Sequence, residues 1–199
     1  PILSVYTDDG WSHEAFFSRG DCNFSEVSDY DVRITAPADY TLVTTGVLTN
    51  EEASGDMVTY TYEAPFVRDF VFCASRDFVI KDGYFEDIHI NIVYSELDDK
   101  MNDGMADLAL EAAQNSLEAF SDIFGRYPYE ELDVVFAPIW AGGMEYPTLV
   151  IIDDSFFQYP DDEAAAQNYV DNMQSTVTHE IGHQWFFAIV GNNNYLQPW

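Results

Sequence analysis

The sequence predicts an α+β protein in which strands come first and a strand, helix, strand arrangement follows. Two observations predict it. Short runs of alternating polar and apolar residues fill the first part of the chain, and two long helical patterns with apolar strands between them fill the second. With 199 residues, of which 47% are hydrophobic, the chain is long enough to bury a core in one large domain or two smaller ones.

The first part of the chain has the pattern of half-buried strands. Residues 30–35, 57–62 and 88–93 alternate between polar and apolar side chains. Turn-forming residues at 37–39 and 50–56 separate these runs at the spacing expected of a sandwich or a meander. The sequence therefore predicts a sandwich or a meander of strands in this region.

A long amphipathic helix is predicted next. Apolar residues recur at helical spacing from Met101 onward and stop at Gly125, with Pro128 just beyond, and these are common signals for the end of a helix. Two apolar strands are predicted after it, at 132–136 and 148–152. The order strand, helix, strand predicts α/β layering.

The last predicted helix begins near residues 161–163, whose acidic side chains suit the positive end of a helix dipole. Its apolar stripe predicts a buried face. The residues of that stripe are Tyr169, Val170, Met173, Val177, Ile181 and Trp185.

Near residue 83 the sequence pattern changes from strands alone to strands mixed with helices. We therefore predict a β domain over residues 1–83 and a second, α/β domain over residues 84–199. Residues 1–6 read as the middle of a strand, so the chain is expected to be a piece of a longer protein.

Composition excludes some functions. The formal net charge of −29, from 36 acidic and 7 basic residues, repels phosphate backbones, so nucleic acid is excluded as a partner. No run of eighteen apolar residues occurs, so this piece is predicted to hold no membrane segment. Cys22 and Cys73 lack the spacing of a zinc knuckle, and either one disulfide or two free thiols fits them.

The strongest chemical signal is the sequence HEIGH at residues 179–183. Positions i and i+4 lie on one face of a helix, so His179 and His183 can direct their imidazoles at a single metal ion. Glu180 lies one step around the helix, near enough to hold a water molecule at that metal. The pattern predicts a zinc-dependent hydrolase in which Glu180 is the catalytic base, because zinc lowers the pKa of a bound water to about 7. The other two histidines, His13 and His89, lack a partner at ligand spacing and are assigned no role.

A second motif supports this interpretation. Residues 141–147 (AGGMEYP) resemble the GxMEN signature of the aminopeptidase N family of zinc metallopeptidases, or gluzincins, and residues 179–186 (HEIGHQWF) resemble that family's HEIxHQWF string. Residues 29–37 and 45–46 also look like the last strands of the family's N-terminal β domain.

The resemblance implies the end of a β-sandwich-like domain followed by the first part of a thermolysin-like catalytic domain. It implies a zinc aminopeptidase that takes peptides with a free N-terminus. Under it, Glu145 binds the α-amino group of the substrate, and the strand with Gly142, Gly143 and Met144 pairs with the substrate backbone.

The sequence departs from the family pattern in two ways. Tyr146 stands where the signature usually has asparagine, which is expected to alter the first side-chain pocket. The family's third zinc ligand, a glutamate, is expected beyond Trp199. The chain as given is therefore expected to be inactive by itself, because zinc affinity depends on a complete ligand set.

Two alternative functions stay open at this point. A metallo-endopeptidase would cleave internal bonds and would not need a free substrate N-terminus. A non-catalytic module of the same fold would bind no metal, so zinc would not raise its melting temperature.

Overall fold

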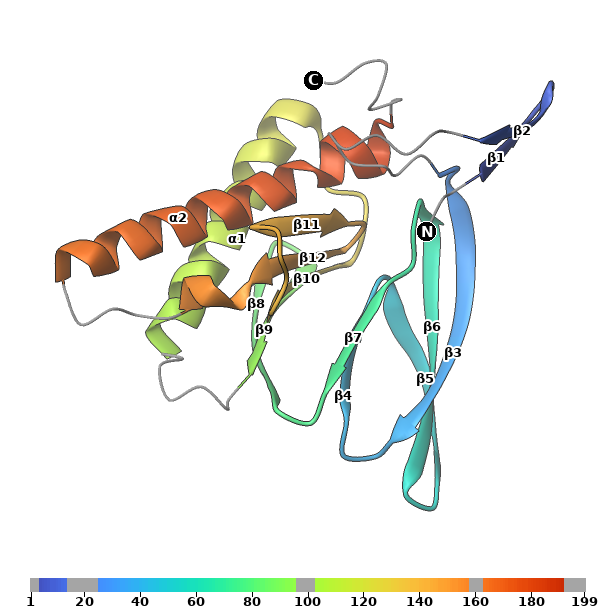
Figure 1. Cartoon of the computed structure of the whole chain (residues 1–199), viewed down its shortest axis with the longest axis horizontal. Helices are drawn as coiled ribbons and strands as arrows, with labels where there is room; N and C mark the ends of the chain where they lie inside the picture. The colour runs from blue at the N-terminus through green and yellow to red at the C-terminus, as the bar shows by residue number, and fades with distance from the viewer. Residues whose placement is uncertain (1–3, 14–24, 96–102, 158–162, 192–199) are drawn as a thin grey trace.

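The computed structural model describes residues 4–13, 25–95, 103–157 and 163–191. Its central element is a five-stranded sheet in the order β11-β12-β10-β9-β8 (Figure 1). Strands β9, β10 and β12 run parallel to one another, whereas β8 and β11, at the two ends of this order, run antiparallel to their neighbours. The strands are β8 (Phe78–Phe85), β9 (Ile88–Ser95), β10 (Glu131–Ala137), β11 (Gly143–Tyr146) and β12 (Leu149–Asp153).

Two long helices, α1 (Asp103–Phe124) and α2 (Glu163–Gly182), cover one face of this sheet (Figure 1). Helix α1 connects the parallel strands β9 and β10, which makes a βαβ unit. It ends before Gly125, which has φ of +101°, a conformation that glycine adopts without strain. The main core lies between the helices and the sheet. It includes Ile90, Ile92, Leu117, Val134, Phe136, Val150, Ile152, Met173, Val177 and Ile181.

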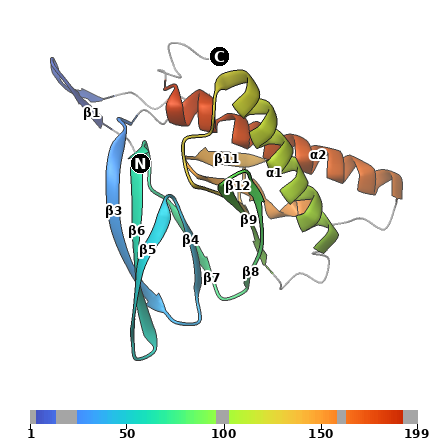
Figure 2. The ribbon, with the colours of Figure 1, turned by 180° about the vertical axis from the view of Figure 1, so that it is seen from behind.

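The N-terminal strands lie on the side of the sheet away from the helices (Figure 2). A three-stranded antiparallel sheet has the order β3-β6-β5, and a two-stranded one pairs β4 with β7. A second, smaller core contains Val43 of β4 with Val93, Val135, Leu149 and Ile151 of the central sheet. The strands are β1 (Ser4–Thr7), β2 (Gly10–His13), β3 (Ser28–Pro37), β4 (Thr41–Thr44), β5 (Val47–Ser54), β6 (Met57–Val67) and β7 (Phe72–Ser75).

Two short helical segments border α2. A 3-10 helix, η1, spans Asp154–Phe157, and a π-helical turn, η2, spans Gln184–Ile189 directly after the HEIGH sequence. In the π turn the backbone N–H of Ala188 donates to the carbonyl of His183 at 3.0 Å, a wider turn than in an α-helix. Such turns are frequent at functional sites.

The α+β prediction is confirmed in its coarse form, since the structure has mostly strands and two long helices. The strands predicted at 30–35, 57–62, 88–93, 132–136 and 148–152 and both helices are present. The domain boundary near residue 83 stays a prediction; that position falls within β8, which pairs with β9 in the central sheet.

One predicted core residue was wrong. The side chain of Tyr169 is 39% exposed, because it lies at the edge of the apolar stripe of α2, whereas Met173, Val177 and Ile181 are completely buried. The predictions for Met101, Cys22, Trp199 and the first three residues fall outside the described part of the chain. Among the described residues, none of the helices combines the length and the hydropathy of a membrane span.

A buried carboxyl group in β10 makes stability depend on pH. Asp133 is buried and accepts a 2.8 Å hydrogen bond from the side-chain amide of Asn91. Burial, assisted by the nearby Glu131, raises its pKa well above the ordinary range. Between the ordinary pKa of aspartate, about 3.9, and this raised value, the folded state holds a proton that the unfolded state has released. The free energy of unfolding therefore falls as pH rises through this interval.

Replacing Asp133 with asparagine is expected to remove that fall in stability. The amide is neutral at all pH values and its oxygen still accepts the hydrogen bond from Asn91. We expect the stability of Asp133→Asn relative to the parent to increase as pH rises, measured by urea unfolding at several pH values. A constant difference across the pH series would show that Asp133 does not hold a proton in the folded state.

Candidate functional site

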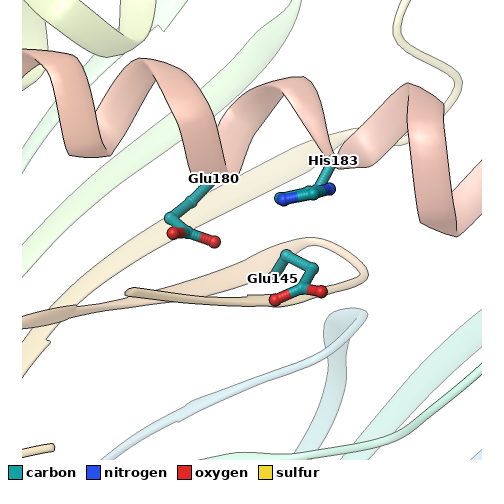
Figure 3. Close-up of side chains that lie close together, drawn as sticks. All are labelled: Glu145, Glu180 and His183. Carbon is teal, nitrogen blue, oxygen red and sulfur yellow. The ribbon is translucent and has the colours of Figure 1, made fainter. Parts of the chain in front are cut away.

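The end of helix α2 and the edge strand β11 bring three predicted site residues together. Figure 3 shows Glu180 and His183 projecting from α2 toward Glu145 on β11. One ligand atom from each of these side chains lies within 4.8 Å of those from the other two. Two sequence motifs separated by more than thirty residues therefore meet across one gap between a helix and a strand.

The fourth residue, His179, lies one helical turn before His183. The Nε2 atoms of the two imidazoles are 3.1 Å apart, and the rings are nearly perpendicular, with an interplanar angle of 86°. On a tetrahedral zinc ion with Zn–N bonds of about 2.0–2.1 Å, two ligand nitrogens lie roughly 3.3–3.4 Å apart. The separation of the two Nε2 atoms is close to that on a shared zinc ion, and it is also that of a direct hydrogen bond between the rings. His179 is not among the three residues whose ligand atoms all lie within 4.8 Å of one another.

The two carboxylates of the site are buried. Glu145 is only 6% exposed, and Glu180 is only 5% exposed. Two buried carboxylates within 4.8 Å of each other repel, and a cation between them offsets both the repulsion and the loss of hydration. The site therefore has the negative charge and the donor atoms that suit a divalent metal ion.

The glycine-rich strand leaves the space that Glu180 occupies. A Cβ atom on Gly143 would lie less than 3.0 Å from the Oε1, Cδ and Cγ atoms of Glu180. Because side chains alternate along a strand, Gly143 and Glu145 face helix α2. Met144 faces the other way and packs on the smaller core, so only its backbone is available on the helix side. Gly142 is exposed and precedes the strand.

Helix α2 is fixed in rotation by its buried face and by Trp185. The indole N–H of Trp185 donates to the carbonyl of Gly125, at the end of α1, with a length of 2.8 Å. Its ring packs against Phe120 with a centroid distance of 5.6 Å. The guanidinium of Arg68 donates to the carbonyls of Phe187 and Ala188 at 2.9 and 3.2 Å, which satisfies the end of the π turn from the N-terminal strands.

The sequence reasoning missed a buried pair of residues beside the site. Gln184 is completely buried, and its side chain is hydrogen-bonded to the turn between β11 and β12. In that turn Thr148 has φ of +63°, which for a β-branched residue is strained by about 1–3 kcal/mol. The hydroxyl of Thr148 accepts from the backbone N–H of Gly46 at 2.9 Å. The signal was a glutamine within an otherwise apolar helical face, next to a metal motif.

Tyr146, where the sequence departs from the GxMEN signature, is half-buried at the end of β11. Burial raises the pKa of its phenol above the ordinary value, and the negative charges of Asp69 and Glu145 raise it further. The phenol is therefore protonated at neutral pH and offers a hydrogen-bond donor.

His89, to which no role was assigned, lies away from these residues on β9. Its ring nitrogens are 3.5 Å from carboxylate oxygens of Asp82 and Glu131, and the ring stacks on Tyr84. These contacts account for His89 as a surface histidine. The side chain of His13 is outside the described part of the chain.

Comparison with known proteins gives one family match and several relatives. Residues 108–199 match the family model described as "Peptidase family M1 domain". Aminopeptidase M1-D of Oryza sativa subsp. japonica is 24% identical over 176 residues, which cover 85% of this chain and 20% of that protein. Endoplasmic reticulum aminopeptidase 1 of Rattus norvegicus is 35% identical over 94 residues, covering 46% of this chain and 10% of that protein. Aminopeptidase Q of Mus musculus is 34% identical over 110 residues, covering 54% of this chain and 19% of that protein.

The chain thus spans a fifth or less of the length of these relatives. Its helix α2, the π turn and strands β10 to β12 all lie within the residues that match the family.

Proposed function

We propose, from the match of residues 108–199 to the model of peptidase family M1, that the full-length protein is a zinc-dependent aminopeptidase that hydrolyses the first peptide bond of peptides with a free N-terminus. His179 and His183 are the zinc ligands within this chain, and Glu180 is the catalytic base. The observation that carries the proposal is the meeting of Glu145, Glu180 and His183 within 4.8 Å.

Glu180 has the position for both proton transfers of the reaction. A zinc ion, when bound, supplies a Lewis acid that lowers the pKa of water to about 7 and polarises the scissile carbonyl. Glu180 takes the proton from the attacking water and then gives it to the nitrogen of the leaving amine. The carboxylate of Glu180 is buried between α2 and β11, where bulk water is largely excluded. Its interaction with the proton that it moves is therefore stronger than in water.

Glu145 supports cleavage at the N-terminus in preference to internal bonds. Its buried carboxylate lies on the strand side of the gap, opposite Glu180 and His183 (Figure 3). An ammonium group that binds Glu145 places the first peptide bond next to Glu180, so the carboxylate measures one residue from the substrate N-terminus.

Strand β11 supports binding of the peptide backbone. It is the last strand in the order of the central sheet and pairs with β12 along one edge. A peptide that lies along the other edge, in an extended conformation, would add one strand to the sheet. Gly142 and Gly143 allow that close approach because they carry no side chain, and Met144 contributes its backbone only.

The experiment compares hydrolysis of an aminoacyl p-nitroanilide with hydrolysis of its N-acetyl derivative by the full-length protein, with and without a metal chelator. We expect cleavage of the free amine form, loss of activity with the chelator and recovery with zinc. Equal cleavage of the acetylated form would favour an endopeptidase, and absence of both cleavage and zinc binding would favour a non-catalytic module.

Replacing Glu145 with glutamine is expected to reduce the preference for a free N-terminus. A hydrogen bond to a charged group contributes about 1.5–3 kcal/mol, so we expect kcat/KM for the free amine substrate to fall roughly 10- to 150-fold. Zinc content should not change. The matched control is Glu51→Gln, which removes an exposed carboxylate on β5, and it should behave as the parent. A Glu145→Gln variant with unchanged kcat/KM would remove Glu145 from substrate recognition.

A further inference from the structure

The side chain of Gln184 connects the segment that directly follows His183 to the turn that follows Glu145. Its Oε1 atom accepts from the backbone N–H of Thr148 at 2.9 Å, and its Nε2 atom donates to the carbonyl of Tyr146 at 2.9 Å. The opposite orientation of the amide would place an N–H against an N–H and an oxygen against an oxygen. Both ends of the amide are therefore matched to the turn.

The two bonded backbone groups flank Pro147, at the tip of the hairpin formed by β11 and β12. Tyr146 directly follows Glu145, and Gln184 directly follows His183. One side chain thus connects the residue next to the proposed amine-binding carboxylate with the residue next to a proposed zinc ligand. Gln184 is completely buried and its two hydrogen bonds are short, so this side chain ties the two elements together directly.

Thr148 connects this hairpin turn to the rest of the protein. The backbone carbonyl of Thr148 accepts from the N–H of Asp133 on β10 at 2.8 Å, and its hydroxyl accepts from the N–H of Gly46 at 2.9 Å. With Gln184 bonded to its N–H, all three polar groups of Thr148 have partners, which keeps a β-branched residue at φ of +63°. Thr148 is therefore held by three hydrogen bonds, of which Gln184 supplies the one that comes from the helix side.

The helix does not need Gln184 for its own placement. Trp185 bonds to the end of α1, and Val177 and Ile181 are buried against the sheet, so the position of α2 over the core is set by other contacts. What Gln184 adds is the position of the hairpin tip relative to the helix.

We propose that Gln184 is a positioning residue that sets the place of Glu145 relative to His183 and thereby the recognition of the substrate α-amino group. This inference rests on the proposed aminopeptidase function. A substitution of Gln184 can weaken amine recognition, or it can weaken metal binding or folding, and the test must separate these effects.

The test compares two inhibitors on the zinc-loaded full-length protein. One is an amino-acid hydroxamate, and the other is the same hydroxamate with hydrogen in place of the α-amino group. The ratio of their inhibition constants reports the α-amino group alone, since both bind the metal through the hydroxamate. The variant is Gln184→Met, which keeps the length of the side chain and removes both hydrogen bonds. The matched control is Gln167→Met, which removes an exposed amide on helix α2 that donates to Asp171 at 2.8 Å.

We expect the ratio to fall by about tenfold or more in Gln184→Met, because misplacing a charged hydrogen-bond partner removes most of its contribution. The inhibition constant of the hydroxamate without the amine should stay within about threefold of the parent's, since the zinc ligands are retained. Gln167→Met should leave both constants unchanged. A ratio equal to the parent's, or equal weakening of both inhibitors, would overturn the proposal and leave Gln184 with a structural role only.

Should Gln184→Met not fold, Gln184→Asn decides. Its amide is one methylene shorter and cannot reach both Thr148 and Tyr146, so the ratio should lie below that of the parent, and a ratio equal to the parent's overturns the proposal. If the parent itself prefers neither inhibitor, the aminopeptidase function has failed, and the role of Gln184 in amine recognition falls with it. A parent that prefers the amine form, together with unaffected Gln184 variants, contradicts only the role of Gln184.

Discussion

Replacing Glu180 with glutamine is expected to lower kcat for peptide hydrolysis by roughly 10²- to 10⁴-fold, the usual contribution of a general base. The amide has nearly the same shape but cannot take the proton from water. Since Glu180 is not proposed to bind the metal, zinc content should stay equal to the parent's. Both quantities are measured on the full-length protein, by steady-state kinetics and by metal analysis of the purified variant.

Glu118→Gln is the matched control for this prediction. Glu118 is an exposed carboxylate on helix α1, so its replacement makes the same chemical change away from the site. We expect its kcat to equal the parent's. If Glu180→Gln retained kcat within a few-fold of the parent, a different group would have to move the proton.

Replacing Gly143 with alanine is expected to reduce activity almost as much, although the residue is not charged. The added methyl group would meet the side chain of Glu180 at less than 3.0 Å. Glu180 is buried and has little room to move, so its carboxylate must leave the position from which it reaches the attacking water. We expect kcat to fall by about 10²-fold or more, as follows from misplacing a catalytic group. Zinc content should again be unchanged.

The neighbouring Gly142→Ala variant separates this effect from a general effect on the strand. A methyl group on Gly142 meets no atom within 4 Å, so Glu180 stays in place. Any loss in Gly142→Ala reports contact between the strand and the substrate. The excess loss in Gly143→Ala reports displacement of Glu180. Equal losses in the two variants would contradict the proposed steric cause.

The sequence was sufficient to predict the helix that carries the HEIGH motif and the strands on either side of it. Spacing of four residues on a helix places His179 and His183 on one face, and this local geometry does not depend on the rest of the fold. The Nε2 separation of 3.1 Å agrees with that expectation. The apolar residues Val177 and Ile181 predicted which face is buried, and both are completely buried.

The contact between the two motifs could not be derived from spacing. Glu145 reaches Glu180 and His183 because β11 lies at the end of the central sheet and its glycine side faces α2. The order of strands in a sheet is decided by packing between distant segments. In this chain only the family resemblance implied that the two motifs share a site.

The residues that were missed act through long-range hydrogen bonds. Gln184 and Thr148 are separated by 36 residues in sequence and meet only when the hairpin tip packs on the helix end. The positive φ of Thr148 could not be foreseen, because a β-branched residue is among the least suited to it. Tyr169 was misplaced for a related reason: periodicity predicts the centre of a buried stripe better than its edge.

Two bends of the N-terminal region contribute to both sides of the site. Gly46 bonds to Thr148 at the hairpin tip, and Arg68 bonds to the carbonyls that end the π turn after His183. The N-terminal region therefore contacts the site both on the side of the β11–β12 hairpin and on the side of the π turn.

The proposed function requires that one zinc ion is shared by His179 and His183 next to Glu180. Anomalous diffraction at the zinc absorption edge, on crystals of the zinc-loaded full-length protein, would locate that ion. We predict a single peak within bonding distance, about 2.0–2.1 Å, of the Nε2 atoms of both histidines. Zinc bound elsewhere, or to only one of the two rings, would contradict it.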